Sequence, residues 1–217
     1  MANEKNHETK KLKGGKKTDW KFVAQIAAIA VLAGLLIYNV FPKGTYTIGT
    51  VSASDVIPKG VPAVYGKELG VSYDDVSPSN PQTTEATINK LASFEDMQLG
   101  NTTMQRYIRI AGSISCEYCC DAQALIFSDG SRACGCSHSY AMRGLAKYLL
   151  TKHPEMSDSE ILSELGKWKT LFFPGILQNK AKALQQNGIS LDYVNLASNK
   201  YRGIENGQSS GEMVGDC

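Results

Sequence analysis

Five of the six cysteines in this 217-residue chain lie in one short stretch of the sequence, together with a histidine. Thiolate sulfur and imidazole nitrogen are the ligands that soft metal ions such as Cu(I) and Zn(II) prefer in proteins. Neighbouring thiols can also form and exchange disulfides. The candidate donors are Cys116, Cys119, Cys120, Cys134, Cys136 and His138. Their number and closeness predict that this stretch carries the chemistry of the protein.

The spacing of these donors suits a convergent metal site. Two residues separate Cys116 from Cys119, which allows both thiolates to face one ion, and Cys134, Cys136 and His138 follow at every second position. A tetrahedral zinc site needs about four such donors at roughly 2.0 to 2.3 Å from the ion. Six donors exceed one such shell. Three alternatives follow: a four-ligand Zn(II) site with spare cysteines, a thiolate-rich Cu(I) site of one or more ions, or disulfides.

A β-hairpin is predicted to join the two halves of the cysteine stretch. Residues 124–127 form a short strand-like run, and residues 128–131 have the composition of a tight turn. Residues 139–150 have the apolar pattern of a helix, which places Cys136 and His138 near its N-terminus. A helix N-terminus favours the thiolate, the form of cysteine that binds metal.

This layout resembles a treble-clef-like metal knuckle, although the usual second half of that motif has two ligands separated by two residues. The run Cys134-Gly135-Cys136, with its nearby histidine, also resembles the cysteine-rich CYCGC proteins of bacterial surfaces. Those proteins have no known function and are regarded as metal binders. The resemblance therefore implies a metal-binding surface protein. The proline, cysteine and tyrosine that precede this run in the motif are absent here, since Arg132 and Ala133 precede Cys134.

The N-terminal part of the chain predicts a membrane anchor. Residues 1–21 carry seven lysines against three acidic residues, which indicates a disordered basic cytoplasmic tail. Residues 22–41 form the one long apolar run, and about 20 residues suffice to cross a bilayer. Because the lysines precede this run, the C-terminal domain is predicted to be extracytoplasmic. The segment from Tyr38 to Pro42 lacks a small-residue cleavage site, which favours an uncleaved signal-anchor in the cell membrane.

Three further segments follow the predicted anchor. Residues 42–82 contain five prolines and many glycines, which predicts an extended stalk. Residues 83–202 show helical apolar spacing and a capping box at 157–160, which predicts a helical cysteine-rich domain. Residues 203–217 are polar and glycine-rich, which predicts a flexible tail. The predicted fold class is therefore mainly α, with a single transmembrane helix, an extended stalk, and a small helical domain carrying a cysteine-rich β-hairpin or metal knuckle.

Composition narrows the function classes. A formal net charge of +2 gives no indication of a nucleic-acid partner. Beyond the predicted anchor, His138 and His153 are the only histidines, and neither lies near a serine-nucleophile signature, so an enzyme is not favoured. The leading hypothesis is a membrane-anchored, extracytoplasmic soft-metal-binding protein. It would carry, sense or handle Cu(I) or Zn(II) and meet a metal-donor or metal-acceptor protein.

Two other hypotheses remain open from the sequence. In the first, Cys116 and Cys119 cycle between dithiol and disulfide, which an oxidising location outside the membrane favours. In the second, the ion or the disulfides are purely structural. They stabilise a surface domain whose function is to bind other proteins.

Overall fold

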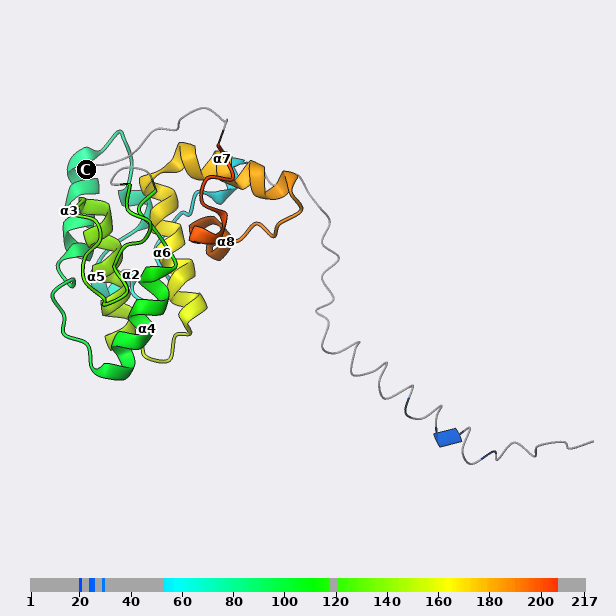
Figure 1. The fold of residues 1–217 in the computed structure, drawn as a ribbon. Coiled ribbons are helices and arrows are strands. Elements are labelled where there is room, and N and C mark those ends of the chain that lie inside the picture. Colours follow the sequence, from blue (N-terminus) through cyan, green and yellow to red (C-terminus); the bar gives the residue numbers. More distant parts are fainter. Residues whose placement is uncertain (1–19, 21–23, 26–28, 30–52, 118–120, 207–217) are drawn as a thin grey trace, which may run out of the picture. The chain divides into compact units, whose positions relative to one another are not determined.

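The structure is a computed structural model that describes residues 20, 24–25, 29, 53–117 and 121–206. The chain divides into two compact units, Met1–Gly49 and Thr50–Cys217. The second unit is mainly helical, as the sequence predicts (Figure 1). Its described elements are η1 (Ala53–Val56), α2 (Gly66–Leu69), η2 (Tyr73–Asp75), α3 (Pro81–Ala92), α4 (Asn101–Gly112), α5 (Ser137–Lys152), α6 (Asp158–Phe172), α7 (Pro174–Gln186), α8 (Tyr193–Ala197) and η3 (Asn199–Tyr201).

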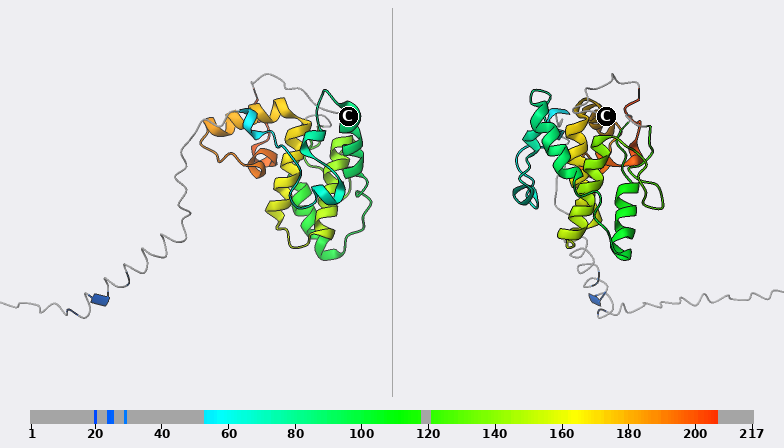
Figure 2. Two further views of the ribbon diagram at one scale, coloured as in Figure 1. Left: turned by 180° about the vertical axis from the view of Figure 1, so that it is seen from behind. Right: turned by 90° about the vertical axis from the view of Figure 1, so that its left-hand side faces the viewer.

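Helices α5 and α6 form the centre of the second unit and lie side by side (Figure 2). Helix α5 also packs against α3 and α4, while α6 packs against α7 and α8. The close approach of α3 requires Gly144 on α5, because a Cβ atom there would overlap the Leu91 carbonyl oxygen. The beginning of α6 follows from its sequence: Ser157 and Glu160 form the predicted capping box, in which each side chain accepts a backbone N–H from the other residue.

Residues 53–80 fold onto the helices and do not form a stalk. The side chains of Tyr65 and Tyr73 are buried. The Tyr65 hydroxyl donates a hydrogen bond to Glu164 Oε2 (2.9 Å) and accepts one from Trp168 Nε1 (2.6 Å), and both partners lie on α6. The predicted stalk over 42–82 is therefore corrected for residues 53–82. Its prolines and glycines do prevent long helices, but they do not prevent the side chains between them from packing.

The predicted β-hairpin is not found, because the described residues contain no strand. Ile126 and Arg132 form an isolated antiparallel bridge, and the Phe127 N–H donates to the Ser131 carbonyl (2.9 Å), so the predicted turn is present without a ladder. The Ala133 N–H also donates to the Leu125 carbonyl (3.2 Å) across the turn, and one arm bonds to another segment as well. The Leu125 N–H donates to the Ile114 carbonyl at 2.9 Å, which holds this arm against the segment that follows α4.

Within the described part of the chain, no helix is long and apolar enough to span a membrane. Most of the predicted span over 22–41 lies outside the described residues, as do the basic tail of residues 1–19 and the last eleven residues of the predicted C-terminal tail, 207–217. The anchor and its orientation therefore stay predictions.

Candidate metal centre

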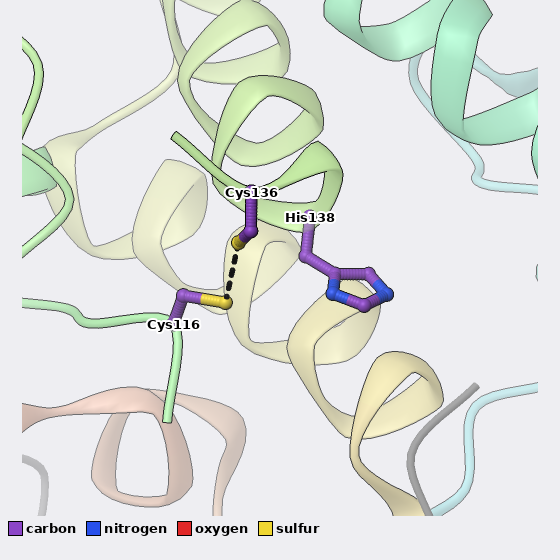
Figure 3. A group of neighbouring side chains, drawn as sticks. All are labelled: Cys116, Cys136 and His138. Atoms are coloured by element: carbon purple, nitrogen blue, oxygen red, sulfur yellow. Dashed lines mark hydrogen bonds between the residues drawn. The ribbon is translucent and has the colours of Figure 1, made fainter. Parts of the chain in front are cut away.

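Cys116, Cys136 and His138 come together inside the helical unit (Figure 3). Their potential ligand atoms all lie within 4.8 Å of one another. The two sulfur atoms face each other at 3.2 Å, and the imidazole lies beside them. Both cysteines are thiols, since 3.2 Å is far longer than the roughly 2.05 Å of a disulfide bond. Two sulfur atoms and one imidazole in this arrangement could hold a metal ion.

Two chain segments position these side chains. Cys136 is the N-cap residue of α5, where its Sγ accepts a hydrogen bond from the Ser139 N–H (3.4 Å), and His138 lies in the first turn of the same helix. Cys116 lies in the segment after α4. An antiparallel bridge between Ile114 and Ser198 ties that segment to the C-terminal part of the chain. The fold therefore brings together donors that are twenty or more residues apart in sequence.

The site is closed to solvent. Cys116 and His138 are fully buried, and Cys136 is 4% exposed. The His138 ring packs against Phe172 and Phe173, with ring centroids 4.8 and 5.1 Å apart, at the C-terminal end of α6. An apolar wall of this kind excludes water and so controls access to the site and the polarity around an ion.

The surroundings of Cys136 favour its thiolate. Contact with the Cys116 thiol is the main cause that lowers the pKa of Cys136, and burial opposes it. With hydrogen bonds from His138 and Ser139, the pKa is lowered to about 3. Cys136 is therefore in the form that binds metal at neutral pH.

The structure brings together three of the six predicted donors. Cys134 lies close, with its Sγ 3.5 Å from Cys136 Sγ, but it is disulfide-bonded, so its sulfur is not a thiolate. Cys119 and Cys120 lie outside the described residues, and their part in the site stays a prediction.

A buried group of charged side chains next to the site was missed from the sequence. Glu117, directly after Cys116, is fully buried together with Lys169 of α6 and Lys180 of α7. The Lys169 Nζ lies 2.5 Å from Glu117 Oε1, and the Lys180 Nζ lies 3.9 Å from the same oxygen. Burial raises the pKa of Glu117, but the two lysines outweigh it and the pKa is lowered overall. Burial lowers the pKa of Lys180 to about 8.

A signal for these lysines was present in the sequence. Lys169 falls four residues after Leu165, and Lys180 falls three residues after Leu177, so both lie on the apolar face of their helices. A lysine on such a face either extends its amine to solvent or finds a buried partner. The partner, Glu117, could not be read from the sequence because it comes from a distant segment.

A second buried ion pair holds the Cys134 segment against α5. Arg143 is fully buried and pairs with Glu95, which also accepts from Arg132 Nε at 2.9 Å. One guanidinium nitrogen of Arg143 donates to the carbonyl oxygens of Cys134 (2.8 Å) and Leu125 (3.2 Å). These bonds tie the backbone on both sides of the turn to α5.

No protein-family model, curated protein or solved structure matches this chain.

Proposed function

We propose that this chain is a membrane-anchored, extracytoplasmic protein that binds a soft metal ion, Cu(I) or Zn(II), through Cys116, Cys136 and His138. The observation that carries the proposal is the meeting of these three donors within 4.8 Å of one another in the protein interior. Sulfur and imidazole donors favour copper and zinc over calcium and magnesium, which take oxygen ligands.

The donor geometry needs only a small adjustment to accept an ion. Zinc–sulfur bonds of about 2.3 Å in a tetrahedral arrangement place two sulfurs roughly 3.8 Å apart. The sulfurs of Cys116 and Cys136 are 3.2 Å apart, so modest side-chain rotations would suffice. Three donors suit Cu(I), whereas Zn(II) would take a fourth. For that fourth ligand we propose Cys119 or Cys120, because both follow Cys116 closely in sequence.

The burial of the site favours a second candidate function, in which the ion staples a surface interaction domain. The three donors are at most 4% exposed, so a metal-donor or metal-acceptor protein could reach the ion only after the fold opens around the site. An ion held in this way adds its binding free energy to the stability of the fold. The two functions differ in how fast the ion leaves the folded protein.

Metal analysis of the full-length chain tests the proposal. We expect the protein, purified anaerobically, to hold copper or zinc, and Cys116→Ser, Cys136→Ser and His138→Gln each to lose most of it. His153→Gln is the matched control, because His153 lies at the other end of α5, about 22 Å along the helix axis. Full metal content in the three site variants would overturn the assignment of ligands.

Competition with a soluble chelator separates the two functions. An ion that a Cu(I) or Zn(II) chelator removes much faster than the protein unfolds supports carrying or sensing. An ion released only at the rate of global unfolding supports the structural staple. The unfolding rate can be measured on the same sample by circular dichroism.

A further inference from the structure

The charged side chains around Glu117, next to the proposed metal centre, include more cations than carboxylates. Lys169 and Lys180 are at most 1% exposed, and their amines lie 2.5 and 3.9 Å from the same oxygen of Glu117. The half-buried Arg202 donates to the Glu117 carbonyl oxygen (3.1 Å), and the buried carboxylate of Glu205 acts on Lys180. Three cationic side chains therefore face two carboxylates, which leaves one positive charge in excess.

The excess positive charge falls mainly on Lys180. Lys169 is the closer partner of Glu117, and Lys180 donates to the Ser198 carbonyl oxygen over 3.4 Å, which is long for a hydrogen bond. The lowered pKa of Lys180, about 8, agrees with an ammonium group that its surroundings compensate incompletely. Burying such a charge is costly, so a further anion close to Lys180 would be stabilised there.

The proposed metal centre can supply this anion. Glu117 directly follows Cys116, and Lys169 lies one turn before Phe172 on α6, whose ring packs against His138. Cysteine thiols lose their protons when they bind a metal ion. With two thiolates and a neutral imidazole, Cu(I) therefore forms a centre with one negative charge, whereas Zn(II) forms a neutral one. Zn(II) reaches the same negative charge only with a third thiolate.

We propose that Lys180 is a specificity-determining residue of the metal site, whose buried positive charge favours an anionic metal–thiolate centre. This inference rests on the proposed function and specifies the charge of the bound centre. With the three described donors, the favoured ion is Cu(I). Because the lysine is buried, salt screens this attraction only weakly.

Opposite changes of charge at two positions test the inference. Cu(I) affinity of the full-length protein is measured anaerobically by competition with a chromophoric Cu(I) chelator. Lys180→Met removes a positive charge and should weaken Cu(I) binding by about tenfold or more. Glu117→Gln removes a negative charge and should strengthen it by about threefold or more. Lys180→Arg keeps the charge and should bind nearly like the wild type. The exposed Lys182 of α7 provides the matched control, because Lys182→Met should not change the affinity.

The opposite signs separate the effect of charge from damage to the fold. Each of the two variants replaces a fully buried charged side chain, so structural damage alone would weaken Cu(I) binding in both. An affinity that moves in the same direction in both variants, or in neither, would overturn the inference and leave the proposed function standing. Zn(II) binding without Cu(I) binding would also overturn it.

Failure of the proposed function gives a different result. A wild type that binds neither Cu(I) nor Zn(II) would overturn the metal centre itself. If Lys180→Met does not fold, Lys180→Gln replaces it, and circular dichroism shows which variants are folded. The gain expected from Glu117→Gln is measured in either case.

Discussion

The Lys169 ammonium lies 2.5 Å from the Glu117 carboxylate, and both side chains are buried. Glu117 directly follows Cys116, so this ion pair ties the Cys116 segment to α6. Lys169 also donates to the carbonyl oxygen of Ala197, the last residue of α8, at 3.1 Å. The same lysine therefore links α8 to the Cys116 segment. The position of a proposed metal ligand therefore depends on a charge pair that has no donor role of its own.

Lys169→Met should destabilise the protein strongly. Removing one partner of a buried ion pair typically costs about 3–5 kcal/mol, and here Lys180, at 3.9 Å, would be the closest cation left to compensate the Glu117 charge. Urea unfolding monitored by circular dichroism measures this loss. The double variant Glu117→Gln with Lys169→Met should recover part of it, since no unpaired carboxylate remains. The exposed Lys182 on α7 supplies the control, because Lys182→Met should change stability by no more than about 0.5 kcal/mol. A single variant as stable as that control would show that the pair contributes nothing.

The sequence predicted the helices better than it predicted their packing. The capping box at Ser157 and the apolar spacing along α5 and α6 are local patterns, and local patterns decide helix boundaries. The meeting of Cys116 with Cys136 and His138 was also predictable, because the cysteines are clustered and α5 begins beside them. By contrast, Tyr65 packs against α6 about one hundred residues away, and no local pattern shows such a contact.

Because local patterns do not show contacts between distant segments, the buried charged side chains beside the site were also missed. Glu117, Lys169 and Lys180 come from three segments that only the folded chain brings together. The prediction of an extended stalk failed over residues 53–80 for a related reason. The prolines and glycines there indicate that long helices are absent, but they do not indicate whether the aromatic side chains between them are buried.

Stability should rise between about pH 8 and pH 10.4 because of Lys180. In the folded protein the pKa of Lys180 is lowered to about 8, mainly by burial and also by the charges of Lys169 and Arg202. The carboxylates of Glu117 and Glu205 act in the opposite direction. An unfolded lysine has a pKa of about 10.4, so between these values the unfolded chain binds more protons than the folded chain. The penalty of charging Lys180 is fully present below about pH 8 and disappears as the pH rises, a gain of about 3 kcal/mol.

Comparing the wild type with Lys180→Met isolates this contribution. Urea unfolding at several pH values should show a rise in the free energy of unfolding for the wild type, and this rise should be smaller in the variant by about 3 kcal/mol. If the free energy of unfolding changes with pH equally in the two proteins, Lys180 has an ordinary pKa in the folded protein.

Removal of the ion should lower the melting temperature of the protein. Structural zinc sites contribute on the order of 10 kcal/mol, so even a fraction of that amount would be visible by calorimetry. Cys136→Ser provides the control, because it should melt at the same temperature with and without a chelator. If the wild type loses its metal and its melting temperature does not change, the ion has no structural role.

Cys120→Ser should separate a copper centre from a zinc centre. Cu(I) can share bridging thiolates among several ions, so the loss of Cys120 should reduce Cu(I) stoichiometry or affinity. Zinc needs four ligands, and Cys119 could supply the fourth, so zinc affinity should stay within about a factor of three, or roughly 0.7 kcal/mol. Titrations of both ions into the apo protein measure this difference. Unchanged copper binding in the variant would remove the multi-ion copper hypothesis.

Gly144→Ala should destabilise the protein and weaken metal binding at the same time. A Cβ atom at Gly144 would overlap the backbone of Leu91, so α5 must move away from α3, at a cost of about 1–3 kcal/mol. Because Cys136 and His138 lie at the N-terminal end of α5, this movement should also shift the donors relative to Cys116. Gly112→Ala is the matched control. Its added methyl group meets no atom within 4 Å on α4, so it should stabilise the protein by about 0.5–1 kcal/mol and leave metal affinity unchanged. If Gly144→Ala lowers stability without changing metal affinity, the donors are held by the N-terminal turn of α5 alone, and the packing of α3 against α5 has no part in the metal centre.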